Sequence, residues 1–121
     1  MRKILIIEDQ APMAKILSDI LKKENFETFT AINGQAGIDK AVEIRPDMVI
    51  TDIMMPVKTG WEVLKELRAM PAFEKTPIFI ITAKGGASDS KTAADGGASG
   101  FIQKPFSPSQ IVEEIKKILG E

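Results

Sequence analysis

Short apolar runs alternate with longer amphipathic stretches along the whole chain. Strands that are covered on both faces of a parallel sheet have unbroken apolar sequences rather than an alternation of apolar and polar residues. Three of the runs have this character, whereas the second is interrupted by polar residues and the fifth is short, which favours the edges of a sheet. The five predicted strands include residues 4–7, 26–31, 48–50, 78–81 and 101–102.

The segments between these runs carry apolar residues at helical spacing. The clearest stripe predicts one helix and is formed by Met13, Ile16, Leu17, Ile20 and Leu21. Weaker or shorter stripes predict three more helices, among them one with Val42 on its apolar side, and these helices include residues 38–42, 61–67 and 111–119. In segment 85–97 the only apolar side chains are alanines between glycine pairs, so we expect a short, loosely held helix there.

Five strands alternating with five helices indicate an α/β protein with helices on both faces of a parallel sheet. Right-handed crossovers leave few topologies for such a chain. The length suits a flavodoxin-like (βα)5 fold with strand order 2-1-3-4-5, which also places the second and fifth strands at the edges. We expect a single domain over residues 1–121.

The composition excludes several kinds of chemistry. The chain has no Cys and no His, which excludes disulfide scaffolds, thiol nucleophiles, the Ser-His-Asp triad and most zinc sites. A net charge of −1 argues against direct nucleic-acid binding and against a polybasic membrane patch. The first apolar run is too short for a signal peptide, and no run is long enough to cross a membrane, so we predict a cytoplasmic protein without membrane insertion.

Polar residues lie at or just after the carboxyl ends of the predicted strands. Ligands of such sheets bind beyond these ends. Glu8 and Asp9 follow the first strand, Asp52 follows the third, Thr82 the fourth and Lys104 the fifth. Taken singly, each of these residues is more simply a helix cap, a strand residue or a solvated surface residue. Their joint occurrence at the correct strand ends instead predicts one acidic site built from segments far apart in sequence.

Three clustered carboxylates repel one another unless a cation compensates them. Mg²⁺ takes oxygen ligands and is held in proteins by one or two carboxylates together with a phosphate oxygen. A metal-held phosphoryl group beside a carboxylate indicates attack by that carboxylate on phosphorus. Asp52 is the predicted nucleophile because it stands alone at the end of the central strand, with Thr82 and Lys104 as ligands of the phosphoryl oxygens.

These motifs, in this order, resemble the receiver domain of bacterial response regulators, in particular stand-alone regulators of the chemotaxis type. The resemblance extends over essentially the whole chain and rests on Glu8-Asp9, the stretch from Asp52 through Pro56 to Gly60, Thr82-Ala83 and Lys104-Pro105-Phe106. It implies that Asp52 accepts phosphate. It also implies that Mg²⁺ (or Mn²⁺) is bound by Glu8, Asp9, Asp52 and the backbone carbonyl of Met54, and that Lys104-Pro105 occupies a cis-peptide position.

The same resemblance implies a signalling switch rather than an enzyme with turnover. The phosphoryl donor would be a sensor histidine kinase or a phosphotransfer protein, and the downstream effector stays unknown. Thr82 and Phe101 would act as switch residues that change the face formed by the fourth helix, fifth strand and fifth helix; ordinary strand packing of Phe101 is an equal alternative. Met54 cannot orient water by hydrogen bonding, so we expect a persistent phosphorylated state.

Three other functions fit the sequence less well. An aspartate-nucleophile phosphatase would carry a second aspartate at the position of Met54, and a flavin carrier would not place Glu8-Asp9 in its phosphate loop. A receiver-shaped module that binds proteins without phosphorylation would not need the complete set of site residues. The sequence leaves open whether the chain acts alone or comes from a longer protein.

Overall fold

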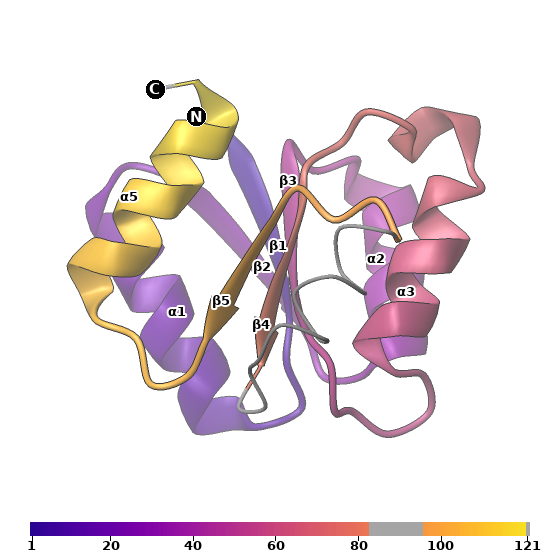
Figure 1. Ribbon diagram of the computed structural model, residues 1–121, viewed down its shortest axis with the longest axis horizontal. Helices are drawn as coiled ribbons and strands as arrows, with labels where there is room; N and C mark the ends of the chain where they lie inside the picture. Colours follow the sequence, from indigo (N-terminus) through magenta and orange to yellow (C-terminus); the bar gives the residue numbers. More distant parts are fainter. Residues whose placement is uncertain (83–95, 121) are drawn as a thin grey trace.

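The protein forms a five-stranded parallel sheet covered by helices on both faces (Figure 1). The structure, a computed structural model, describes residues 1–82 and 96–120, without the side chain of Thr82. The strand order β2-β1-β3-β4-β5 confirms the predicted topology. The strands are β1 (Lys3–Ile7), β2 (Glu27–Ala31), β3 (Met48–Asp52), β4 (Ile78–Thr82) and β5 (Gly100–Gln103).

The helices begin where side chains satisfy their free backbone amides. Asn33 accepts from the amide of Ala36 at 2.8 Å, and Thr59 forms a reciprocal capping box with Glu62. Ser107 accepts from the amide of Gln110 at 3.1 Å. The described helices are α1 (Ala11–Lys23), α2 (Gly34–Ile44), α3 (Gly60–Arg68), the short 3₁₀ helix η1 (Pro71–Phe73) and α5 (Pro108–Leu119).

The central strands explain why the apolar runs are unbroken. Successive side chains of β1 point to opposite faces of the sheet, so Leu5 and Ile7 pack with α2 and α3, whereas Ile4 and Ile6 pack with α1 and α5. All four side chains are buried. At the edge, β2 is mostly exposed or half-buried, as its polar residues indicated.

Two helical predictions were wrong in detail. Ile16 is 50% exposed and Val42 is 52% exposed, although both were assigned to the core sides of their helices. In α1 the buried side is instead formed by Ala14, Leu17, Ser18 and Leu21, because the small residues allow that side to approach the sheet. The helix predicted in segment 85–97 lies, apart from its last two residues, outside the described part of the chain.

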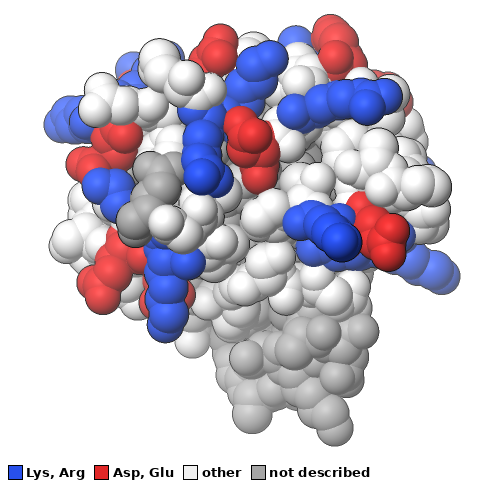
Figure 2. Space-filling model, turned by 90° about the horizontal axis from the view of Figure 1, so that it is seen from above, with Lys and Arg blue, Asp and Glu red and all other residues white. Residues whose placement is uncertain are grey.

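Charged side chains of both signs share the end of the molecule that is opposite to the carboxyl ends of the strands (Figure 2). Three helices have basic residues in their last turns at this end, where the helix dipole favours positive charge. These residues are Lys22 and Lys23 of α1, Lys65 and Arg68 of α3, and Lys116 and Lys117 of α5. Acidic side chains lie between the basic ones in Figure 2, so the described residues form no extended patch of one sign on this face.

The start of α3 packs directly against the end of β3. A Cβ atom at Gly60 would lie 2.2 Å from the carbonyl oxygen of Asp52 and 2.9 Å from the Cα of Ile53. The amide of Gly60 donates to the carbonyl of Ile53 at 2.8 Å. Only glycine allows this contact, because both neighbouring atoms belong to the backbone and cannot rotate away.

We therefore expect Gly60→Ala to lower the free energy of unfolding by about 2 kcal/mol or more, through the steric clash with Asp52. Urea unfolding measures this change. Thr59→Ala is the matched control, because it removes the adjacent helix cap, at a cost of about 1 kcal/mol, without adding an atom near β3. Equal losses of unfolding free energy in the two variants would contradict the close contact of Gly60 with Asp52.

Candidate functional site

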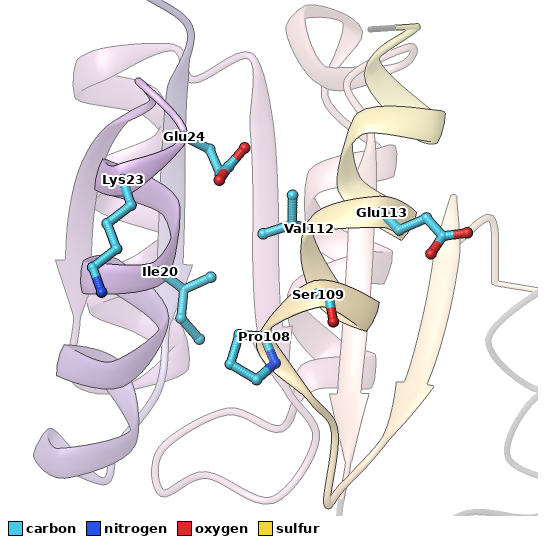
Figure 3. A pocket seen from close by; sticks show the side chains of 7 residues that line it. All are labelled: Ile20, Lys23, Glu24, Pro108, Ser109, Val112 and Glu113. Atoms are coloured by element: carbon cyan, nitrogen blue, oxygen red, sulfur yellow. The ribbon is translucent and has the colours of Figure 1, made fainter.

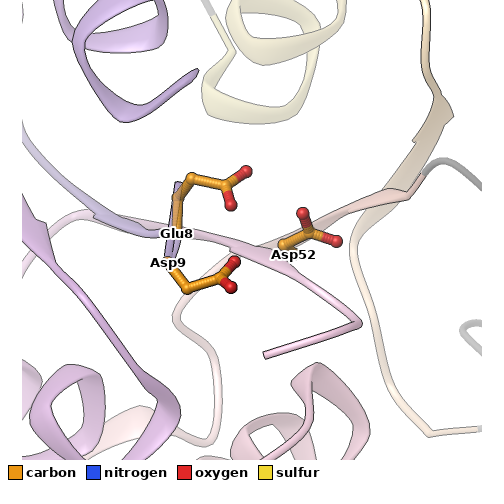
Figure 4. Close-up of side chains that lie close together, drawn as sticks. All are labelled: Glu8, Asp9 and Asp52. Atoms are coloured by element: carbon orange, nitrogen blue, oxygen red, sulfur yellow. The ribbon is translucent and has the colours of Figure 1, made fainter. Parts of the chain in front are cut away.

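An acidic cluster lies at the carboxyl ends of β1 and β3 (Figure 4). The parallel register pairs Ile7 with Thr51, so the next residues along, Glu8 and Asp52, face each other at the edge of the sheet. Asp9 follows in the loop to α1. One carboxylate oxygen from each of Glu8, Asp9 and Asp52 lies within 4.8 Å of the other two. The predicted convergence of these three residues is therefore found in the structure.

The Asp52 carboxylate is held by donors on both of its oxygens. Its Oδ1 accepts from the amide of Ile53 at 2.6 Å and, more weakly, from the amide of Met54 at 3.4 Å. Its Oδ2 accepts from Lys104 Nζ at 2.8 Å. The side chain is 10% exposed. These contacts orient a nearly buried carboxylate toward the mouth of the site.

Lys104 connects the fifth strand to the acidic cluster. It follows β5 directly, and its peptide bond to Pro105 is cis, as the resemblance implied. Besides Asp52, its Nζ contacts Glu8 Oε1 at 3.3 Å, and its side chain is 16% exposed. One ammonium group thus bridges two of the three carboxylates.

Glu8 is the most buried member of the cluster, with a side chain that is 2% exposed. Burial, followed by the charge of Asp52, raises its pKa from 4.5 to about 7. The amide of Gln10, which donates to Glu8 Oε2 at 3.2 Å, and the charge of Lys104 oppose this rise without cancelling it. Glu8 therefore titrates close to neutral pH in the metal-free protein.

The pKa of Lys104 shifts by a balance of opposite effects. Burial lowers it, but the hydrogen bond and charge of Asp52, together with those of Glu8, raise it above its ordinary value. Lys104 is therefore positively charged at neutral pH and serves as the fixed cation of the site.

The donor set suits a hard divalent cation. Glu8, Asp9 and Asp52 offer only oxygen ligands, and carboxylate oxygens are typical ligands of Mg²⁺, Ca²⁺ and Mn²⁺. Asp9 is exposed, whereas the other two are buried, so the cluster opens to solvent on one side. A cation held there would keep some of its water ligands, as Mg²⁺ usually does.

The other predicted site residues are described less completely. Thr82 ends β4, where its backbone pairs with Gln103, the neighbour of Lys104; its side chain lies outside the described part. Phe101 in β5 is half-buried and packs against the core under α2 and α3. The amide of Met54 donates to Asp52, and Met54 is 61% exposed. The metal, phosphate and switch roles of these three residues stay predictions.

Sequence reasoning missed the backbone donors of the site. The amides of Ile53, Met54 and Gln10 hold the carboxylates, and every residue type except proline has such an amide, so no sequence pattern identified them. The contact of Gly60 with Asp52 was also missed, although a glycine eight residues after a strand-end carboxylate was visible in the sequence.

Comparison with known proteins shows similarity to one family over most of the chain. The family model described as the response regulator receiver domain matches residues 4–116. The chain is 30% identical to the chemotaxis response regulator CheY4 of Vibrio cholerae, with a TM-score of 0.93 and coverage of 98% of each chain. It is 28% identical to a chain described as a response regulator from Chloroflexus aurantiacus, with a TM-score of 0.94 and coverage of 99% of this chain and 98% of the other.

A third solved structure shares the fold. It is the receiver domain of the sensor histidine kinase PA1611 from Pseudomonas aeruginosa, described with a magnesium ion coordinated in its active site cleft. At 22% identity it shows a likeness of fold alone, with a TM-score of 0.90 over 99% of this chain and 98% of the other. No helix among the described residues is both long and apolar enough to cross a membrane.

The raised pKa of Glu8 predicts an inverse dependence of stability on pH in the metal-free protein. Between pH 4.5 and about 7 the folded state binds a proton that the unfolded state has released, so stability falls as pH rises. We expect the free energy of unfolding in EDTA to drop by up to about 3 kcal/mol across this window, and Glu8→Gln to remove the slope.

Urea unfolding of both proteins at a series of pH values measures this difference. Glu43→Gln is the control, because Glu43 is exposed and forms only a surface ion pair with Lys40. If Glu8→Gln kept the slope of the wild type, the burial of Glu8 would not be the cause.

Proposed function

The chain belongs to the response regulator receiver domain family of two-component signalling, and from this premise we propose that it is a phosphorylation-dependent switch. Members of this family are signalling regulators rather than classical enzymes. In our proposal a sensor histidine kinase or a phosphotransfer protein supplies a phosphoryl group, Asp52 accepts it, and the modified protein changes its affinity for an effector. A single receiver domain over residues 1–121 and a cytoplasmic location are parts of this proposal.

One observation carries the proposal. Lys104 Nζ lies 2.8 Å from Asp52 Oδ2, while Glu8 and Asp9 bring their carboxylate oxygens within 4.8 Å of one another and of Asp52. A nucleophilic carboxylate, a fixed cation and an oxygen cradle for a metal therefore meet at one point. Phosphoryl transfer depends mainly on such positioning and neutralisation of charge.

The transfer step uses the residues as follows. An oxygen of Asp52 forms a bond to phosphorus as the bond from phosphorus to the donor's imidazole nitrogen breaks, and the imidazole leaves with the electron pair of that bond. Lys104 is already charged and stands beside the phosphorus position, where it neutralises the transferred oxygens. The amides of Ile53 and Met54 keep the carboxylate in place.

Glu8, Asp9 and Asp52 would hold Mg²⁺, together with the backbone carbonyl of Met54. When bound, the ion supplies positive charge to the phosphoryl oxygens. The magnesium described in the cleft of the Pseudomonas aeruginosa receiver domain is in keeping with this assignment. By the family resemblance we assign exposed Asp9 to direct contact with the metal and buried Glu8 to a metal-bound water.

Phosphorylation changes the partner of Lys104. In the unmodified protein its Nζ is shared between Asp52 and Glu8. A phosphoryl group adds roughly −1.5 to −2 charges and three strong acceptor oxygens, which compete for that ammonium. We propose that Lys104 and the hydroxyl of Thr82 turn to these oxygens and that Phe101 responds, which alters the surface of β5, α5 and the helix predicted for segment 85–97.

A phosphatase of small phosphoesters is less well supported. Such an enzyme needs an acid/base group near the nucleophile to complete turnover. The residue two positions after Asp52 is Met54, whose side chain has no such group and is 61% exposed. The alternative is a receiver that binds its partner without phosphorylation. The phosphate-incorporation test below distinguishes this alternative from our proposal.

The first test is phosphate incorporation. We expect incubation with acetyl phosphate and Mg²⁺ to add about 80 Da, one phosphoryl group, to the wild type and nothing to Asp52→Ala. Intact-mass spectrometry measures the adduct. Asp39→Ala, which removes an exposed aspartate from α2, should behave as the wild type. An unmodified wild type, or an adduct on Asp52→Ala, would refute Asp52 as the acceptor.

The second test concerns the lifetime of the phosphorylated state. A thioether does not orient an attacking water, whereas an amide does. We therefore expect Met54→Asn to shorten the half-life of the phosphorylated protein several-fold, measured by loss of the adduct after removal of the donor. Val57→Asn is the control, because Val57 is also exposed, at 72% against 61% for Met54, in the same loop but lies farther along it from Asp52. An unchanged half-life in Met54→Asn would contradict the role of this position.

A further inference from the structure

Arg68, the last residue of α3, leaves its own helix to join two other segments. Its Nη1 donates to the carbonyl oxygens of Phe73 and Thr76, each at 2.7 Å, and its Nε donates to the carbonyl oxygen of Gly97 at 3.0 Å. The residue is half-buried, and burial lowers its pKa, although an arginine stays charged at neutral pH. None of the ion pairs among the described residues includes it. A charged fork thus holds backbone carbonyls that lie far apart in sequence.

The carbonyl of Gly97 belongs to the turn that leads into β5. Gly97 has a φ of 90°, in the left-handed region that glycine favours. Ser99 fastens the same turn to β4, because its amide donates to the carbonyl of Ile78 at 2.7 Å and its hydroxyl accepts from the amide of Ile78 at 3.1 Å. Figure 1 shows this stretch of chain beside α3. Arg68 and Ser99 together therefore fix the point at which β5 begins.

β5 has few other restraints within the sheet. It is an edge strand, and among the described strands β4 alone pairs with it, over four residues. Lys104 comes directly after β5, and the chain then runs to Pro108, the first residue of α5 (Figure 3). The place of the Lys104 side chain consequently depends on where β5 starts.

α3 connects the start of β5 with the turn after Asp52. The helix begins at Gly60, whose backbone packs against that of Asp52, and it ends at Arg68. Its nine residues span about 13 Å. One helix therefore holds the turn after Asp52 at one end and, through Arg68, the start of β5 at the other. The separation of 2.8 Å between Asp52 Oδ2 and Lys104 Nζ depends on both ends.

We propose that Arg68 is a positioning residue that sets Lys104 against Asp52 and Glu8. This role deepens the proposed function and rests on it, since it gives Arg68 a part in metal binding and phosphate acceptance. Arg68→Lys keeps the charge, but a single ammonium cannot donate in the planar, forked pattern that reaches the three carbonyls. In this variant the start of β5 is released, and Lys104 moves away from the two carboxylates.

Release of Lys104 changes the Mg²⁺ affinity and the phosphorylation rate in opposite directions. Its ammonium competes with a metal for Glu8 and Asp52, so its departure lets Mg²⁺ bind more tightly. The same departure removes the cation that neutralises the transferred phosphoryl oxygens, so phosphorylation becomes slower. A merely structural role of Arg68 would loosen the carboxylates as well, and Mg²⁺ binding would then weaken. The sign of the change in Mg²⁺ affinity therefore separates the two roles.

The first measurement is calorimetric titration of the whole, unphosphorylated chain with Mg²⁺. We expect Arg68→Lys to lower the dissociation constant about threefold or more, and Lys104→Ala to lower it at least as much. The double variant R68K/K104A should bind Mg²⁺ as Lys104→Ala does, because both changes act through the same ammonium. Ser99→Ala, which releases the same turn from β4, should shift the dissociation constant in the same direction.

The second measurement is the rate of phosphate incorporation from acetyl phosphate at saturating Mg²⁺. We expect Arg68→Lys to slow this rate about tenfold. Two variants serve as controls and should keep the Mg²⁺ affinity and the rate of the wild type. Lys65→Arg makes the reverse exchange at an exposed residue in the last turn of α3. Ile4→Val removes a buried methyl group in β1 and so lowers stability at a position outside α3 and β5.

Urea unfolding checks that every variant is folded. If the wild type takes phosphate but Arg68→Lys shows neither shift, the role of Arg68 alone is refuted. If the wild type takes no phosphate, the proposed function is refuted, and the Mg²⁺ titrations still decide the role of Arg68. An Mg²⁺ affinity that is unchanged or weaker in Arg68→Lys, a double variant that adds the two effects, or a wild type that binds no Mg²⁺ would each overturn the proposal.

Discussion

The repulsion among Glu8, Asp9 and Asp52 is the constraint on which the structure of the site depends. Full charges less than 5 Å apart repel by about 3 kcal/mol per pair near a protein surface. The protein reduces this cost in two ways that the structure shows. Lys104 donates to two of the carboxylates, and burial raises the pKa of Glu8 to about 7, so the three acids do not all carry full charge at neutral pH.

The parallel sheet makes this crowding unavoidable. Since Ile7 pairs with Thr51, the residues that follow them leave the sheet side by side, and both are acidic. Lys104 leaves β5 at the same edge, so the compensating cation comes from a strand formed near the other end of the sequence. The backbone contact at Gly60 then fixes the turn that follows Asp52. The arrangement that we propose for binding a metal and a phosphoryl group is thus set by strand register rather than by any single loop.

The sequence predicted the fold and the position of the site because both follow from periodicity. Unbroken apolar runs identified β1, β3 and β4, and residues that close parallel strands must meet at one edge. Ile16 and Val42 were misassigned because an apolar residue at helical spacing is compatible with either the core or an exposed strip. The bridging of Glu8 by Lys104 and the amide donors on Asp52 depend on distances of a few ångströms, which no pattern of residue types contains.

A short stretch of backbone connects the acidic site to the start of α5. Lys104 contacts Asp52, and four residues later Pro108 begins α5. Phe106, between them, lines a hollow beside α1 together with Lys104 itself. A charge added at Asp52 acts first on Lys104, because that ammonium is the nearest fixed cation in the described site. The start of α5 is then the nearest described surface on which a change at Asp52 can alter contacts with another molecule.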